Sequence, residues 1–283
     1  MLGGASNVSH NIAAMSATAY MCGVVGKDHN GYKVIDLLHD KKIKTDYVFE
    51  STTRPTTLKT RVVANHQQIV RIDWEETGHL PADLNKRIVK AVKERINDID
   101  VVIIEDYGKG VINPHLLTDL VALCREHKKI ITVDPKDEHF DYYQGVTSLT
   151  PNLKEAAYFV DFKVKTDEDI DRCGKAIMDR LQSESLLITL GDKGMKLFRK
   201  DGSTFHLPTF AQEVFDVSGA WDTVIAIFSF ALGTGATFEE AAALSNLAAG
   251  IVVGKLGTAV TDPEELAQKV EDTYDRVKKG HRA

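Results

Sequence analysis

The chain contains the stretch Phe215-Asp216-Val217-Ser218-Gly219-Ala220-Trp221-Asp222-Thr223, and an apolar run follows from Val224 to Leu232. Small residues lead into an acidic residue and then into a helical pattern, so the stretch predicts a turn that opens onto a helix N-terminus. The free N–H groups and the dipole of such a helix end favour an anion. Beside that anion, Asp222 could take a proton from an attacking hydroxyl. The same residues also fit an ordinary helix start with Ser218 as N-cap.

Composition bounds the class of protein. The 283 residues suffice for one large α/β domain or two small ones. Hydrophobic residues make up 43% and charged residues 27%, which are ordinary proportions for a globular protein. A net charge of −6 disfavours broad binding to nucleic acid or to an anionic membrane. A local basic pocket could still hold a small anionic substrate.

Cysteine usage and hydropathy bear on location. Cys22, Cys124 and Cys173 are few, odd in number and far apart, which favours free thiols in a reducing compartment and gives no zinc pattern. No apolar run reaches membrane-spanning length, and the N-terminus lacks a basic-then-apolar signal. We therefore expect a cytoplasmic protein.

The chain beyond Pro81 alternates apolar strands with helices. Strands are predicted at 101–104, 130–133, 148–150 and 186–189, and helices at 82–97, 114–127, 167–182, 220–232, 238–253 and 263–278. Continuous apolar strands separated by helices predict a mainly parallel sheet covered on both faces. Ligands bind beyond the carboxyl ends of such strands, where polar tails occur at 106–109, 134–136, 152 and 191–194.

The N-terminal part has a different pattern. A glycine pair, Gly3-Gly4, feeds a predicted helix at 9–15, and a strand is expected at 18–25, followed by a loop at 26–31 and a helix to about 42. Short strands at 47–50, 59–64 and 68–73 carry polar and basic residues at alternate positions, with a hairpin turn at 65–67. These short strands predict a small sheet apart from the main core.

Several familiar motifs are absent. No Gly-Lys pair is followed by Ser or Thr, so there is no Walker A loop, and no G-x-G-x-x-G follows a strand. Neither H-E-x-x-H nor G-x-S-x-G occurs, which leaves zinc-protease and α/β-hydrolase interpretations without support.

The motifs that do occur, taken in order along the chain, resemble the ribokinase-like (PfkB) family of carbohydrate kinases, and within it the heptose 7-phosphate kinases. The resemblance extends from Gly3 to about Asp262 and rests on residues 3–8, 67–73, 106–110, 149–153, 216–222 and 252–258. It implies a three-layer α/β sandwich over residues 1–283, with a mainly parallel central sheet and a partial β lid within about 45–73. In this family such lids also mediate dimerisation, so a homodimer through the lid is expected.

The resemblance implies phosphoryl transfer from ATP to a sugar hydroxyl, here the anomeric hydroxyl of a heptose 7-phosphate. Asp222 matches the family's catalytic base. Gly219, Ala220 and Trp221 match the anion hole that holds the charge on the transferred phosphoryl group.

The resemblance also implies ATP and Mg²⁺ as cofactors. Asn152 and Glu155 match the N-x-x-E motif that places Mg²⁺ through water. The nucleotide side of the site is matched by Thr189, Gly191, Gly194, Asn246 and Gly250. Taken singly, Asn152 could simply cap the following helix, and Asn246 could be a helix-surface residue.

The sugar side is matched by Gly4, Asn7 and Asp28. For the phosphate of the substrate we select Arg71, Lys109 and Lys136, because a dianion calls for fixed cations. Exposed basic residues are more often solvated surface, and 134–136 could be only a turn at a strand end.

Two departures from the family pattern keep a second hypothesis open. Trp221 stands where the family has glycine, and an indole there could fill the phosphate site or point away from it. Family members also carry a first core strand before the glycine pair, so we expect a sheet that lacks a strand. One hypothesis is a working sugar-phosphate kinase, with another sugar or a nucleoside as alternative substrate. The other is a kinase-fold protein that binds nucleotide or a partner without turnover.

Overall fold

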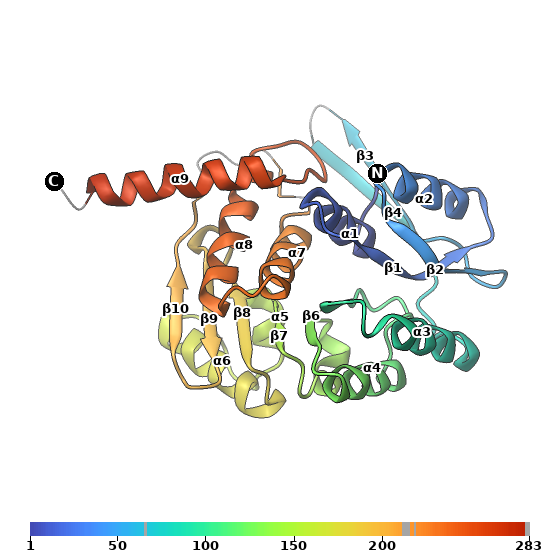
Figure 1. Ribbon diagram of the computed structural model, residues 1–283, viewed down its shortest axis with the longest axis horizontal. Helices are drawn as coiled ribbons and strands as arrows, with labels where there is room; N and C mark the ends of the chain where they lie inside the picture. The colour runs from blue at the N-terminus through green and yellow to red at the C-terminus, as the bar shows by residue number, and fades with distance from the viewer. Residues whose placement is uncertain (65–66, 211–215, 218, 281–283) are drawn as a thin grey trace.

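The computed structural model describes residues 1–64, 67–210, 216–217 and 219–280 (Figure 1). The predicted hairpin turn at Asn65 and His66, together with Phe215 and Ser218, lies outside the described residues. Among the described residues, the helices are α1 (Ala5–Ala14), α2 (His29–Asp40), α3 (Ala82–Arg95), α4 (Pro114–Glu126), α5 (Leu153–Tyr158), α6 (Asp167–Leu181), α7 (Ala220–Gly233), α8 (Phe238–Val252) and α9 (Pro263–Gly280), with 3₁₀ turns η1 (Asp137–Tyr142) and η2 (Gly191–Lys193).

The main sheet has six strands in the order β10-β9-β8-β7-β6-β5. They are β5 (Val101–Glu105), β6 (Ile130–Asp134), β7 (Ser148–Leu149), β8 (Ser185–Thr189), β9 (Met195–Arg199) and β10 (Thr204–Leu207). The first four run parallel, and β9 and β10 add an antiparallel edge. Every residue of β8 is buried, which explains its continuous apolar sequence.

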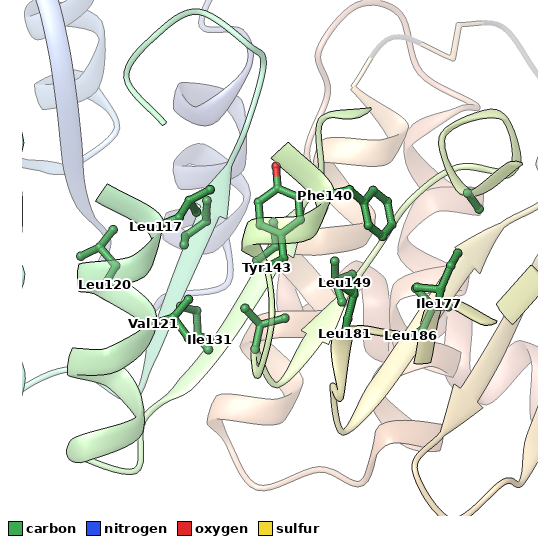
Figure 2. Packing of buried hydrophobic residues seen from close by; sticks show 14 of the residues in the cluster. Leu117, Leu120, Val121, Ile131, Phe140, Tyr143, Leu149, Ile177, Leu181 and Leu186 are labelled. Atoms are coloured by element: carbon green, nitrogen blue, oxygen red, sulfur yellow. The ribbon is translucent and has the colours of Figure 1, made fainter. Parts of the chain in front are cut away.

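Helices cover both faces of this sheet, so the chain forms three layers (Figure 1). Successive residues of β8 face opposite layers: Leu186 and Ile188 join the core under α4 and α6, whereas Leu187 packs with α7 and α8. Figure 2 shows the first core, where the rings of Phe140, on η1, and Tyr143, directly after η1, lie among the side chains of Leu117, Ile131 and Leu149. The predicted sandwich is confirmed.

Across the described residues, no helix combines the length and the apolar content needed to cross a lipid bilayer.

A second, two-stranded parallel sheet pairs β1 (Tyr20–Gly26) with β2 (Lys44–Ser51). No hydrogen-bonded ladder among the described residues joins β1 to β5; instead the two strands line opposite sides of one large cleft. Arg95 at the end of α3 contacts this second sheet: its guanidinium donates to the Tyr47 hydroxyl at 3.1 Å and lies over the Tyr20 ring. The central sheet is therefore interrupted.

The lid is the antiparallel hairpin of β3 (Leu58–Ala64) and β4 (Gln67–Trp74). It forms a sheet of its own, as predicted for the strands at 59–64 and 68–73. The prediction was wrong for the strand at 47–50, which lies in β2 and pairs with β1 instead.

Two helices begin earlier than the sequence predicts. The helix expected at 9–15 is α1, which begins at Ala5 because Gly4 turns the chain with φ 55° directly before it. The loop expected at 26–31 ends at Asp28, whose carboxylate caps α2 by accepting from the Gly31 N–H at 2.8 Å. The 3₁₀ turn η1 was not predicted.

Packing between α6 and β9 gives a test of the core. A Cβ at Gly174 would overlap the buried ring of Phe198. Alanine is the better helix former by about 1 kcal/mol, yet we expect Gly174→Ala to lower the free energy of unfolding by about 1–3 kcal/mol through overpacking. Urea denaturation measures this change, with the exposed Lys175→Ala as control in the same helix. Stability equal to or above that of the parent would contradict the packing described here.

Candidate functional site

The site is built around Asp222 in the first turn of α7. Gly219 is the N-cap of α7 with φ 80°, a left-handed conformation that favours glycine. A Cβ at Gly219 would lie 2.7 Å from the Asn7 amide nitrogen, so the absence of a side chain lets α1 approach α7. The Asn7 Nδ2 then donates to Asp222 Oδ2 at 2.8 Å. Gly4, Asn7, Gly219 and Asp222, all predicted site residues, are therefore brought together.

A second donor reaches Asp222 from the loop after β5. The Tyr107 hydroxyl donates to Asp222 Oδ1 at 2.8 Å. The Tyr107 ring lies against Gly4, where a Cβ would be 3.2 Å from Cε2. Sequence reasoning did not select Tyr107 as a site residue, although it stands two positions before Lys109 in one of the diagnostic stretches.

Burial raises the pKa of Asp222 above its ordinary value, and the hydrogen bonds from Asn7 and Tyr107 lower it in part. Two further carboxyls occupy the ends of the neighbouring strands. The pKa of Glu105 on β5 is raised by burial and then by the charges of Asp134 and Asp222. The pKa of Asp134 on β6 is raised by burial and then by the charges of Glu155 and Asp222. The carboxyl ends of these strands therefore concentrate negative charge in a buried place.

Asp222 lines the large cleft between β1 and β5, together with Gly3, Gly4 and Trp221. The Trp221 side chain is 55% exposed, so the indole neither packs into the core nor distorts α7, which includes it at regular helical geometry. The Ala220 N–H, predicted to belong to an anion hole, donates to the Val217 carbonyl at 3.2 Å.

The lid and the loop after β5 bring basic side chains to the same cleft. Arg71 and Lys109 both line it, and both are paired with carboxylates. The Arg71 guanidinium donates to Asp73 at 2.9 Å, and the Lys109 ammonium donates to Glu75 at 2.6 Å. These bonds hold the two cations in place beside the opening.

Two other predicted substrate residues are placed differently. Lys136 is not among the described residues that line this cleft; its ammonium lies 3.8 Å from Asp137, and its stem packs over Gly108. Asp28 accepts hydrogen bonds from the backbone and side chain of Thr56 as well as from Gly31. The backbone bond from Thr56, ahead of the others, lowers the pKa of Asp28. Asp28 thus fastens α2 to the chain after β2, and its role toward a sugar stays a prediction.

Asn152 and Glu155 form a capping box at the start of α5, so the capping interpretation of Asn152 is correct. Asn152 Oδ1 accepts from the Glu155 N–H at 3.0 Å, and Glu155 Oε2 accepts from the Asn152 N–H at 2.9 Å. The charge of Glu155, like that of Asp222, raises the pKa of Asp134.

The remaining nucleotide-side residues gather around the ends of β8 and α8. Thr189 forms a β-bridge with Asn152, and its buried hydroxyl has no hydrogen-bond partner among the described residues. Gly191 and Gly194 both have positive φ, and a Cβ at Gly194 would overlap the Leu207 carbonyl.

Asn246 is buried and donates to the Pro208 carbonyl at 2.8 Å. It therefore links α8 to the chain after β10 and is not a helix-surface residue. Gly250 lies one turn further along α8.

The donor groups fit magnesium better than a tightly ligated metal. Among the described residues, no three His, Cys, Asp or Glu side chains converge on a point that could hold a metal ion. One carboxylate beside an amide suits Mg²⁺, which keeps most of its water ligands and needs few from the protein. The unpartnered Thr189 hydroxyl also fits a polar ligand at this edge.

Comparison with known proteins gives agreement in sequence and in fold. The profile of the pfkB family carbohydrate kinases matches residues 1–265. Bifunctional protein HldE of Geobacter metallireducens is 42% identical over 265 residues, which are 94% of this chain and 54% of that protein. Bifunctional protein HldE of Helicobacter pylori strain P12 is 37% identical over 276 residues, which are 98% of this chain and 60% of that protein. The chain thus spans between half and three fifths of the length of these relatives.

Solved structures agree on the fold. Arabidopsis thaliana ribokinase, complexed with ribose and ATP, superposes with a TM-score of 0.76 at 20% identity, covering 93% of this chain and 85% of that one. The tetrameric inhibited form of phosphofructokinase-2 from Escherichia coli superposes with a TM-score of 0.79 at 17% identity, covering 94% and 85%.

The raised pKa of Glu105 predicts a pH-dependent cost in stability. The unfolded chain releases this proton at a lower pH than the folded chain, so stability is lost as pH rises from the ordinary carboxyl range through the folded pKa. We expect Glu105→Gln to raise the melting temperature at about pH 8, with the gain shrinking below about pH 4. Thermal unfolding across this range tests the effect, and the exposed Glu126→Gln serves as control. A variant that is less stable than the parent at every pH would contradict it.

Proposed function

The chain belongs to the pfkB family of carbohydrate kinases, and we propose that it transfers the γ-phosphate of ATP to the anomeric hydroxyl of a heptose 7-phosphate. Support for the sugar comes from the sequence motifs and from the similarity to the bifunctional protein HldE of several bacteria. The observation that carries the reaction is the Asp222 carboxylate, held at the N-terminus of α7 by one donor on each oxygen and open to the cleft.

In this proposal Asp222 is the general base. It accepts the proton of the anomeric hydroxyl as that oxygen bonds to the γ-phosphorus, and the bond from phosphorus to the ADP oxygen breaks. The N–H groups of Gly219, Ala220 and Trp221 would face the charge on the transferred group, aided by the positive end of the α7 dipole. The Ala220 N–H would have to leave the Val217 carbonyl for this role.

The nucleotide would be held at the ends of β8 and α8, by Thr189, Gly191, Gly194, Asn246 and Gly250. Asn152 and Glu155 would hold Mg²⁺ through water, and the ion would neutralise phosphate charge. Neutralisation matters here because Asp134 and Glu155 already repel one another. The free hydroxyl of Thr189 is available to a nucleotide oxygen.

The 7-phosphate of the sugar would lie between the lid and the loop after β5. Arg71 and Lys109 present cations to the cleft, and their carboxylate partners Asp73 and Glu75 hold them in position. A phosphate dianion would attract both cations at once. Lys136 and Asp28 remain weaker proposals for substrate contact, since each is engaged elsewhere.

A catalytically impaired kinase is the second candidate, and one observation favours it. The exposed indole of Trp221 lines the cleft next to Asp222, where a bulky group could compete with phosphate. A pfkB kinase for another sugar or a nucleoside is a further alternative. We retain the cytoplasmic location that the few free cysteines favour.

We further propose that two copies of the chain associate through their lids. The hairpin has two unlike faces: Lys59, Arg61 and Arg71 line the cleft, whereas the opposite face is apolar and exposed. On that face Val62 pairs with Val70, and Ile72 follows on the same side. These three side chains are 43%, 46% and 44% exposed, respectively. A second lid would cover such a face.

Kinase activity has a direct test. ADP release with ATP, Mg²⁺ and heptose 7-phosphate should occur in the parent and fall by about 10²–10⁴-fold in Asp222→Asn, which removes the base. The exposed Asp161→Asn controls for the loss of a charge. Fructose 6-phosphate and ribose test the alternative substrates. If the parent is silent and Trp221→Gly is active, the indole blocks the site. Silence in both proteins would contradict the proposed activity.

The lid interface is tested by molar mass in solution. We expect a dimer at micromolar concentration and a shift to monomer in Val70→Asp, because a charge would be buried between the lids. Val270→Asp, on the exposed side of α9, is the control. Light scattering coupled to gel filtration measures both, with circular dichroism to verify folding. A monomeric parent, or a dimeric Val70→Asp, would overturn the proposal.

A further inference from the structure

The loop after β5 is fixed by a buried carboxylate that the proposed reaction does not use. Asp106 is 4% exposed, and its Oδ1 accepts from the Gly108 N–H at 2.9 Å. Its Oδ2 accepts from the Tyr143 hydroxyl at 2.7 Å and lies 2.6 Å from His139 Nδ1. Both rings come from the η1 segment and its end, and the Tyr143 side chain is fully buried.

This anchor determines where the next residue points. Asp106 is bonded to Gly108 across Tyr107, so the loop is closed tightly around Tyr107. Gly108 has φ 62°, and the Tyr107 ring is held on its other side by Gly4. With its backbone and ring both constrained, Tyr107 has its hydroxyl directed at Asp222 Oδ1.

We propose that Tyr107 is a positioning residue for the base: its hydroxyl, anchored through Asp106, orients the Asp222 carboxylate and keeps it ionised. This inference rests on the proposed role of Asp222. Asn7 occupies Oδ2 from α1, so the two donors together fix the plane of the carboxylate. They leave each oxygen a second lone pair for a substrate hydroxyl.

The surroundings of Asp222 explain why such a donor matters. Tyr107 faces it from the loop, and the acids Glu105 on β5 and Asp134 on β6 lie close enough for the charge of Asp222 to raise the pKa of each. Burial disfavours the anion as well. Without the hydroxyl of Tyr107, only the Asn7 amide among the described donors would remain to stabilise the ionised base. The pKa of Asp222 must then rise, since the hydrogen bond favours only the charged form.

The test is Tyr107→Phe, which removes one oxygen and keeps the ring against Gly4. We expect the acidic limb of the kcat/KM profile to move to higher pH by about one to two units, the size expected for a lost hydrogen bond to a charged group. At pH well above the limb, kcat/KM should stay within a few-fold of the parent. Tyr142→Phe, on the exposed side of η1, should leave the profile unchanged. A uniform loss at all pH values, with the limb in place, would overturn the proposal.

A second readout does not depend on turnover. The carboxyl carbon of Asp222, labelled with ¹³C and assigned by comparison with Asp222→Asn, should titrate at higher pH in Tyr107→Phe than in the parent. An unchanged titration would overturn the inference. If the parent shows no kinase activity and the titration still shifts, the proposed function fails and the role of Tyr107 toward Asp222 stands.

The anchor is tested by Tyr143→Phe, with folding verified by circular dichroism. Loss of its hydroxyl loosens Asp106, so this variant should move the same pH limb in the same direction, though less. The double variant with Tyr107→Phe should shift no further than Tyr107→Phe alone, because both act through one bond. Additive shifts would show that the anchor does not act through Tyr107.

Discussion

The Asp222 carboxylate is partly buried at a helix N-terminus, and such a charge requires hydrogen-bond donors. Distant parts of the chain supply them. Asn7 is 215 positions away in sequence and Tyr107 is 115 positions away, yet each donates to one carboxylate oxygen at 2.8 Å. Both contacts depend on a residue without a side chain. Gly219 lets α1 approach α7, and Gly4 leaves room for the tyrosine ring. The helix packing and the site are therefore set by the same close approaches.

The same edge of the sheet concentrates acids that oppose one another. Glu105, Asp134, Glu155 and Asp222 are each raised in pKa by burial before any other cause. Such a group of carboxyls costs stability when it ionises, and groups with pKa values shifted in this way cluster at functional sites. The magnesium ion proposed above would relieve this repulsion, whereas Arg71 on the lid and Lys109 in the loop after β5 present their cations to the cleft.

Much of this arrangement could be predicted from the sequence, because it depends on local patterns. The apolar strands at 101–104, 130–133 and 186–189 predicted the parallel sheet, and the motif around Asp222 predicted a helix N-terminus. The role of Tyr107 could not be predicted in this way, since a tyrosine in a glycine-containing loop has no local signal for a partner on another helix. The Asp106 anchor was missed for the same reason: its ring partners His139 and Tyr143 lie on η1 and directly after it, and this 3₁₀ segment has no clear periodicity. Asn246 was open to a surface interpretation because only the fold shows the Pro208 carbonyl opposite it.

The proposed sugar side and the base both lie along the cleft between β1 and β5. The most direct measurement is ³¹P magnetic resonance of the parent with ATP, Mg²⁺ and heptose 7-phosphate. We expect a new phosphate resonance coupled to the anomeric proton, growing in step with ADP. ADP accompanied only by inorganic phosphate, or a spectrum of unchanged ATP, would contradict the claim that Asp222 activates a sugar hydroxyl in this cleft.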